Sequence, residues 1–189
     1  MTPIHDFAVA AAPWQNFYLL LGTAAATLIG LMFVALTFGA GLMTAQAASS
    51  ARAFIDPPFG HFVTVLLGAC LMLVPTMTPA LLGGALVIVT VLRALALVRV
   101  VRHMRAAHAR YNDIELSDWL MGVVLPAILY AALIAIGAGF IAARTAAFGG
   151  LAVAVVGTLL LGVFGAWELM IWLALTRVRA NDAPRPPQA

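Results

Sequence analysis

The chain alternates between five long apolar segments and short polar stretches. From this pattern we expect helices over residues 17–45, 57–75, 79–101, 118–143 and 146–176, boundaries being approximate. Each segment has the roughly 20 apolar residues that a helix needs to cross the hydrocarbon core of a bilayer. The pattern therefore predicts an all-α integral membrane protein, in which residues 1–179 form a single domain, a bundle of five transmembrane helices.

Capping residues mark where three of the predicted helices begin. In each case a small polar side chain precedes the apolar run, where it can accept hydrogen bonds from the first free N–H groups of a helix. These caps are Asp56 before Pro57 and Pro58, Thr78 before Pro79, and Ser117 with Asp118 before the fourth segment. The polar stretch over 46–56 then separates the first two helices, the second and third form a tight hairpin, and Pro126 should kink the fourth.

The two ends of the chain differ from the apolar segments. Residues 180–189 contain three prolines in a polar context and no hydrophobic face to bury, so we expect a disordered tail. Residues 1–12 contain no arginine, so the positively charged start of a secretory signal is missing there. We therefore expect the first apolar segment to remain in the mature protein.

Charged residues are scarce and unevenly distributed. Of the 189 residues, 64% are hydrophobic and 9% are charged, whereas a soluble domain carries about 25% charged residues. All ten basic residues are arginines; eight lie on one side of a five-span topology, and Arg144 lies alone on the other. Because cytoplasmic loops are enriched in basic residues, this asymmetry predicts an N-terminus outside and a cytoplasmic C-terminus.

The positions of the arginines also bear on partners and location. They lie at the ends of apolar segments, which favours contact with anionic lipid headgroups and argues against a nucleic-acid partner. We expect headgroup contacts at Arg99, Arg102, Arg105, Arg177 and Arg179. The absence of lysine and the abundance of alanine are typical of a GC-rich bacterial genome, so the expected location is the bacterial cytoplasmic (inner) membrane.

Small residues at four-residue spacing mark faces on which we expect helices to pack. In lipid, helices associate through close contacts between small side chains and through interhelical hydrogen bonds. The candidates are Gly22, Ala26 and Gly30 in the first segment, Ala135 and Gly139 in the fourth, and Gly157 and Gly165 in the fifth. Such faces serve either the bundle itself or contact with a second copy, and the sequence leaves both open.

Two charges lie inside the apolar segments. Arg93 lies nine residues before Arg102, and Glu168 lies nine residues before Arg177, so both should lie about 13 Å from the same membrane surface. His61 in the second segment is a third candidate. Because charges in the hydrocarbon are rare and often functional, a proton or ion site at Arg93, Glu168 and His61 is one hypothesis. A structural role is favoured, since one acid and one base do not make a relay. The alternatives are an ion pair that fixes helix register, or an Arg93 that reaches the headgroups.

No motif indicates an enzyme. The sequence has no Ser-His-Asp arrangement and no glycine-rich phosphate loop, and the polar residues from His103 to Asp118 match no metal-site spacing. We expect no catalytic residue, cofactor or metal. The favoured function is a non-enzymatic scaffold, assembly or regulatory subunit that acts through helix contacts in a homo-oligomer or a larger membrane complex; the alternative is a small oligomeric channel or transporter that uses the ion site.

The stretch from Phe17 to Leu36, FYLLLGTAAATLIGLMFVAL, resembles the first span of small multi-span bacterial membrane proteins, most of them uncharacterised. The resemblance covers about one span. It implies an integral membrane fold in bacteria and assigns no activity to any residue.

Overall fold

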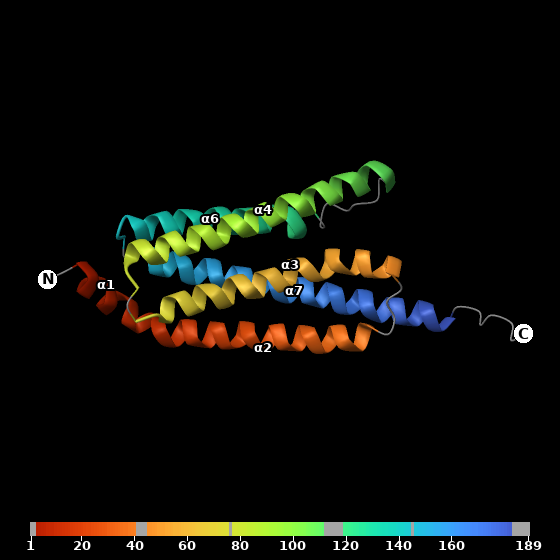
Figure 1. Cartoon of the computed structure of the whole chain (residues 1–189), viewed down its shortest axis with the longest axis horizontal. Coiled ribbons are helices and arrows are strands. Elements are labelled where there is room, and N and C mark those ends of the chain that lie inside the picture. The colour runs from red at the N-terminus through yellow and green to blue at the C-terminus, as the bar shows by residue number, and fades with distance from the viewer. Residues whose placement is uncertain (1–2, 41–44, 76, 112–118, 145, 183–189) are drawn as a thin grey trace, which may run out of the picture.

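The computed structural model describes residues 3–40, 45–75, 77–111, 119–144 and 146–182. Within these residues the chain is helical, without a strand, and its long helices run side by side as an elongated bundle (Figure 1). Five segments are long and apolar enough to cross a membrane: Phe7–Thr37, Ile55–Leu73, Pro79–Val98, Leu120–Ile141 and Ala147–Leu175. The prediction of an all-α chain with five candidate spans is confirmed.

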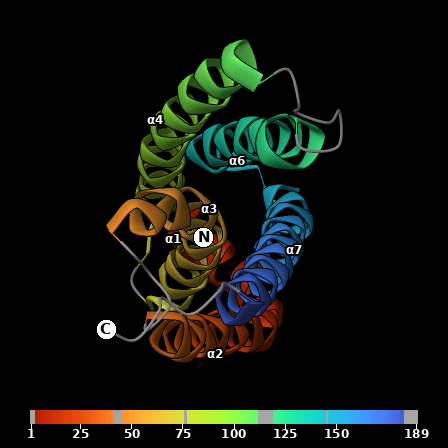
Figure 2. The same cartoon turned by 90° about the vertical axis from the view of Figure 1, so that its right-hand side faces the viewer.

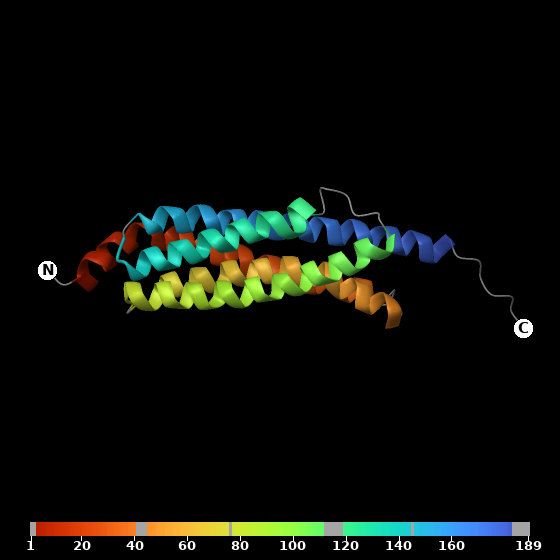
Figure 3. The same cartoon turned by 90° about the horizontal axis from the view of Figure 1, so that it is seen from above.

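The helices follow one another up and down the bundle. In chain order they are α1 (Pro3–Ala11), the 3-10 turn η1 (Ala12–Trp14), α2 (Gln15–Ala40), α3 (Ala45–Leu73), α4 (Pro79–Tyr111), the π-helical turn η2 (Leu120–Val124), α6 (Leu125–Ile141) and α7 (Ala147–Asp182). The turns from α3 to α4 and from α6 to α7 lie at the end where α1 lies, which we call the α1 end (Figures 1 and 3). The opposite end, where α4 and α7 finish, is called the arginine-rich end.

Helix α3 occupies the centre of the bundle. It packs against α2, α7 and α4, whereas α6 packs against α4 and α7. Figure 2, which looks along the bundle from the arginine-rich end, shows α3 between α4 above and α2 below, with α7 on its right and its left side open. The largest group of buried side chains lies toward the α1 end and includes Tyr18, Leu82, Phe140 and Leu151. A smaller group, Met32, Phe62 and Leu169, lies nearer the arginine-rich end.

The second candidate span begins at Ile55, close to the predicted residue 57, but the predicted start of its helix is wrong. Helix α3 begins at Ala45, so Asp56 is not an N-cap, and Pro57 and Pro58 lie inside the helix. Each proline removes one hydrogen bond of the helix, because it has no N–H group. The preceding segment AQAASSARAF is rich in alanine, the strongest helix former, and continues the helix despite this loss.

The ends of the chain also differ from the expectation. Helix α7 extends to Asp182, so residues 180–182 are helical rather than disordered, while 183–189 lie outside the described residues. The sequence did not predict α1. Its Phe7 ring packs on Phe140 and Phe148, with ring centroids 6.1 and 5.2 Å away, so α1 covers this end of the bundle.

Two of the predicted local signals are present. The Leu81 N–H donates to Thr78 Oγ1 over 3.3 Å, so Thr78 caps α4 as predicted. The irregularity expected at Pro126 is the π-helical turn before it, in which the Leu125 N–H donates to the Leu120 carbonyl. The caps predicted at Ser117 and Asp118 lie outside the described residues.

Glycines bring the helices together at several of the predicted positions. A Cβ atom on Gly22 would lie 3.0 Å from the Ala69 Cβ of α3, and one on Gly165 would lie 3.3 Å from Pro58. Gly157 meets Leu129, and Gly139 meets Ala147. Ala26, Gly30 and Ala135, in contrast, are exposed. Four-residue spacing alone therefore does not separate the buried small residues from the outward ones.

A close helix crossing joins α4 to α6 and was not predicted as a pair. A Cβ on Gly83 would overlap the Gly137 carbonyl oxygen, and a Cβ on Gly137 would lie 2.9 Å from the Gly83 carbonyl oxygen. The two backbones therefore touch at these glycines.

Helix α6 ends in a Schellman motif. The Arg144 N–H donates to the Gly139 carbonyl and the Ala143 N–H to the Phe140 carbonyl. Ala143 has a φ of 54°, in the left-handed region that glycine adopts without steric cost.

We expect Ala143→Gly to raise the free energy of unfolding by about 1 kcal/mol, because the left-handed conformation is unfavourable for a residue with a Cβ. Thermal unfolding in mild detergent measures the change. Ala142→Gly is the matched control: with a φ of −80° it gains nothing and should be destabilised by about 0.5 to 1 kcal/mol. Equal losses in both variants would contradict this account of the turn.

Candidate functional site

Arg93 crosses the bundle from α4 to α3. Its guanidinium fills the space above Gly60, where a Cβ atom would overlap Cζ and both terminal nitrogens. Gly60 is buried, and the Arg93 side chain is half-buried. The side chain thus lies between helices and does not run along α4 toward the membrane surface.

The guanidinium reaches two further polar side chains. His61, beside Gly60 on α3, and Tyr130 on α6 are 6% and 3% exposed, and the Tyr130 hydroxyl lies 3.2 Å from His61 Nδ1. Arg93 makes a side-chain hydrogen bond with Tyr130 and acts electrostatically on His61. We call Arg93, His61 and Tyr130 the polar cluster. It joins three helices inside the bundle.

One hydrogen-bonding group of the polar cluster has no partner. The Nε atom of Arg93 is buried and makes no hydrogen bond. Burying an N–H group without a partner costs about 1 to 3 kcal/mol, and more when the group is charged. The cluster therefore leaves part of the hydrogen-bonding capacity of Arg93 unused.

The three members of the polar cluster lie at one depth. Helices α3 and α6 end at the α1 end of the bundle, and α4 starts there. His61 lies twelve residues from that end of α3, Arg93 fourteen residues from that end of α4, and Tyr130 eleven residues from that end of α6. The sequence prediction that Arg93 and His61 share a site agrees with this geometry. Tyr130 was missed; its only signal is a hydroxyl in an otherwise apolar run.

Glu168 lies elsewhere. It is twenty-one residues into α7, about 10 Å closer to the arginine-rich end than Arg93, and its side chain is exposed. Helix α3 packs against both α4 and α7, and α4 and α7 share no extensive contact. Among the described residues, the structure shows no ion pair between Arg93 and Glu168, so the expected pairing is not observed.

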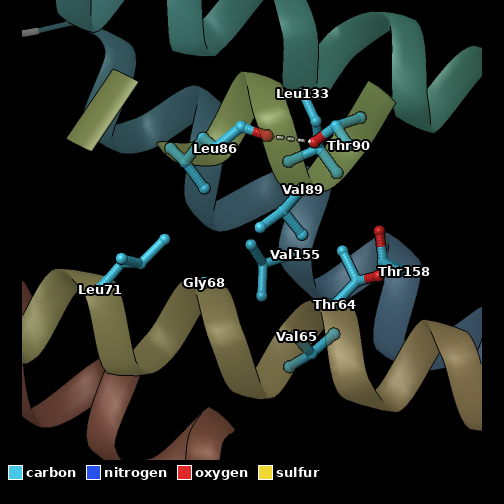
Figure 4. A pocket seen from close by; sticks show the side chains of 10 residues that line it. All are labelled: Thr64, Val65, Gly68, Leu71, Leu86, Val89, Thr90, Leu133, Val155 and Thr158. Atoms are coloured by element: carbon cyan, nitrogen blue, oxygen red, sulfur yellow. Dashed lines mark hydrogen bonds between the residues drawn. The ribbon is translucent and has the colours of Figure 1, made fainter. Parts of the chain in front are cut away.

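Next to the polar cluster, toward the α1 end, lies a small cavity. Its volume is about 10 Å³, at the lower limit for one water molecule. Thr64, Thr90 and Thr158 supply the side-chain oxygens of its wall, and the rest is Gly68 and the apolar side chains labelled in Figure 4. Thr64 and Thr90 each lie within one helical turn of the polar cluster, so the cavity continues it.

Each threonine of the cavity is anchored to its own helix. Thr64 donates to the Gly60 carbonyl over 2.8 Å, Thr90 to that of Leu86 over 2.7 Å, and Thr158 to that of Ala154 over 2.8 Å. Each hydroxyl proton is therefore used within its own helix, and the wall of the cavity is mainly apolar.

The polar region does not continue to the α1 end. Beyond the threonines the described core consists mainly of buried apolar side chains, including Leu82, Phe140, Phe148 and Leu151. The Tyr18 hydroxyl, which lies at that end, donates to the Phe148 carbonyl over 3.4 Å. The polar cluster and its cavity therefore form a closed-ended site within the bundle, not a continuous path.

No other site emerges from the part of the chain that the structure describes. There, no three His, Cys, Asp or Glu side chains lie close enough to hold a metal ion, and residues 112–118 of the polar loop fall outside it. Comparison with known proteins finds no protein-family model, no curated protein and no solved structure that matches this chain.

Proposed function

We propose that this chain is a non-enzymatic membrane protein that acts through helix contacts, as a scaffold, assembly or regulatory subunit. The observation that carries the proposal is the outward face of α2. Thr23, Ala26, Thr27 and Gly30 are all exposed, and a Cβ on Gly30 would meet nothing within 4 Å. The bundle uses Gly22 of the same helix and leaves this outward small-residue face uncovered.

The outward face of α2 differs from those of α4 and α7. Helices α4 and α7 present large side chains, such as Leu81, Ile88, Leu92, Val153 and Leu160. The hydroxyls of Thr23 and Thr27 donate to carbonyls of their own helix over 2.8 and 2.9 Å. The outward face of α2 therefore consists of small side chains whose hydroxyl protons are already bonded. Such a face allows the backbone of a second helix to approach closely. A second copy of the chain supplies a matching face, which favours a homo-oligomer.

Cysteine crosslinking tests this proposal. In a Cys70→Ala background, Ala26→Cys and Gly30→Cys should form a disulfide-linked dimer in the membrane, because the two α2 helices would face each other. Val153→Cys, 74% exposed on α7, is the matched control and should remain monomeric. Native mass spectrometry of the parent in mild detergent reports the oligomer independently. A monomer by both methods would exclude self-association and leave only a different membrane partner.

We further propose that the N-terminus is outside and the C-terminus cytoplasmic in a bacterial cytoplasmic membrane. Helices α3, α4 and α7 carry Arg52, Arg99, Arg102, Arg105, Arg110, Arg177 and Arg179 toward one end of the bundle. This supports contact of Arg99, Arg102, Arg105, Arg177 and Arg179 with anionic headgroups. Reporter fusions after Ala189 and beside Arg144 should fall in opposite compartments, with the first in the cytoplasm; the same compartment for both would exclude this topology.

A second candidate function is favoured by the polar cluster. A small oligomeric channel or transporter would use Arg93 and His61 as its proton or ion site, and Tyr130 would be a third member of that site. Glu168 would lie closer to the arginine-rich end. Ionisable groups inside a membrane bundle mark such sites. In proteoliposomes, Tyr130→Phe should lower ion flux while the protein stays folded. A parent without flux, or an unchanged flux in the variant, would contradict transport through this site.

A further inference from the structure

The polar cluster has more hydrogen-bond donors than acceptors. Arg93 brings five N–H groups, and a neutral His61 and Tyr130 bring one donor each, against three acceptor positions on the imidazole and phenol. The contact between Tyr130 and His61 uses one donor and one acceptor, whichever group donates. The buried Nε of Arg93 makes no hydrogen bond. The cluster therefore has too few hydrogen-bond acceptors of its own for its donors.

The polar cluster also carries a positive charge, that of the Arg93 guanidinium. Asp56 and Glu168, the acidic side chains that the structure describes, are both exposed, and it shows no ion pair between Arg93 and either of them. A charge inside a membrane bundle is costly unless an opposite charge compensates it. A negatively charged hydrogen-bond acceptor would satisfy both the positive charge and the excess of donors.

We propose that the polar cluster binds an oxyanion, a phosphate or carboxylate group, with the Arg93 guanidinium as its principal ligand. The planar fork of a guanidinium donates two parallel hydrogen bonds to two oxygens of such a group. The Arg93 Nε, which makes no hydrogen bond, would supply one of these donors. The inference rests on the ion site of the second candidate function and names the class of ion.

The oxyanion enters from the arginine-rich end. On the α1 side of the cluster lie the small, mainly apolar threonine cavity and, beyond it, the apolar core. At the other end, the arginines of α3, α4 and α7 attract anions to the membrane surface. A phosphate from a lipid headgroup and a free phosphate share this chemistry.

Equilibrium binding tests the inference without any requirement for transport. The thermal unfolding temperature of the protein in uncharged detergent is measured against inorganic phosphate, with chloride at equal ionic strength as the reference. Phosphate that binds the folded state raises this temperature with concentration, and the dependence gives a Kd. Arg93→Gln should weaken the Kd at least about tenfold, since a hydrogen bond to a charged group contributes about 1.5 to 3 kcal/mol.

Two further variants keep the inference falsifiable if Arg93→Gln folds poorly. Tyr130→Phe retains the ring and should weaken phosphate binding by about two- to tenfold, because it frees Arg93 from its hydrogen-bond partner and disorders the fork. Arg144→Gln removes an equal charge from an exposed side chain at the α1 end, away from the proposed entry, and should change the Kd less than about twofold. Equal losses in Arg93→Gln and Arg144→Gln would overturn the site.

Lipid and free phosphate are separated in the same preparations. Native mass spectrometry after reconstitution with phosphatidylglycerol or phosphatidylcholine shows whether an anionic lipid is retained and whether Arg93→Gln releases it. Retention without a response to inorganic phosphate identifies a lipid headgroup, and a phosphate response without retention identifies a free anion. Absence of both in the parent overturns the inference. Absence of flux alone contradicts only transport.

Discussion

Gly60→Ala is expected to destabilise the protein by about 1.5 to 3 kcal/mol, the contribution of a hydrogen bond to a charged group. The new methyl group would occupy the position of the Arg93 guanidinium, so Arg93 would have to leave Tyr130 and His61. Unfolding in mild detergent measures the loss. Gly68→Ala lies on the same helix, where a Cβ meets nothing within 4 Å, and should leave stability unchanged or slightly raised.

A double-mutant cycle separates this contact from a general effect on α3. Once Arg93→Ala has removed the guanidinium, Gly60→Ala has nothing left to displace and should add little further loss. The coupling free energy of the two positions should therefore be large. Additive losses would show that Gly60 does not serve to admit Arg93.

The second large effect is expected at the α4–α6 crossing. Gly83→Ala should cost about 3 kcal/mol, the upper part of the range for overpacking, because its methyl group would meet the Gly137 carbonyl oxygen and, at 2.8 Å, Ile141 Cγ1. A backbone carbonyl cannot move aside as a side chain can. Gly84→Ala, one residue away with open space at its Cβ, is the matched control and should be neutral or slightly stabilising.

Gly137, on the α6 side of the same crossing, provides a second test. Gly137→Ala should also destabilise, since its Cβ would lie 2.7 Å from Val87 Cγ2 and 2.9 Å from the Gly83 carbonyl. Both substitutions push the same two helices apart, so the double variant should lose less than the sum of the single losses. A loss in Gly84→Ala as large as in Gly83→Ala would contradict the crossing.

Local patterns predicted the spans well because each span is decided by its own composition. The apolar runs gave all five candidate spans, and Thr78 gave the start of α4. The start of α3 was missed because two adjacent prolines, at 57 and 58, are a strong local sign of a helix start. The alanine-rich turns before them carry no comparable single signal. The helix propensity of those turns is spread over many residues, and no single residue signals it.

Faces and depths were harder to predict. Four-residue spacing places Gly22, Ala26 and Gly30 on one stripe, whereas α2 buries Tyr18, Leu21, Gly22 and Ala25, spaced by three and four residues. Only Gly22 belongs to both sets. The choice between neighbouring stripes depends on the angle at which α3 crosses α2, which the sequence does not show.

The candidate site shows the same limit. Arg93 and His61 lie together, as the sequence analysis expected, but the depth of Glu168 was misjudged. Arg102 lies twenty-three residues into α4 and Arg177 thirty residues into α7, so these two arginines are about 10 Å apart in level. They do not mark a common surface. The tight turns at the α1 end give a better reference, because both helices start there.

The central position of α3 has a consequence for how the protein is made. Its span has the lowest mean hydropathy of the five, 1.4 against 2.3 or 2.4, and half of its residues are buried. Entry into the bilayer from the translocon depends on hydropathy, so α3 enters least readily by itself. Helix α2, made just before it, offers a protein surface for its polar side chains, and α4 follows through a tight turn. Substitutions that open the contact between Gly22 and Ala69 should therefore appear first as a failure of membrane insertion during synthesis.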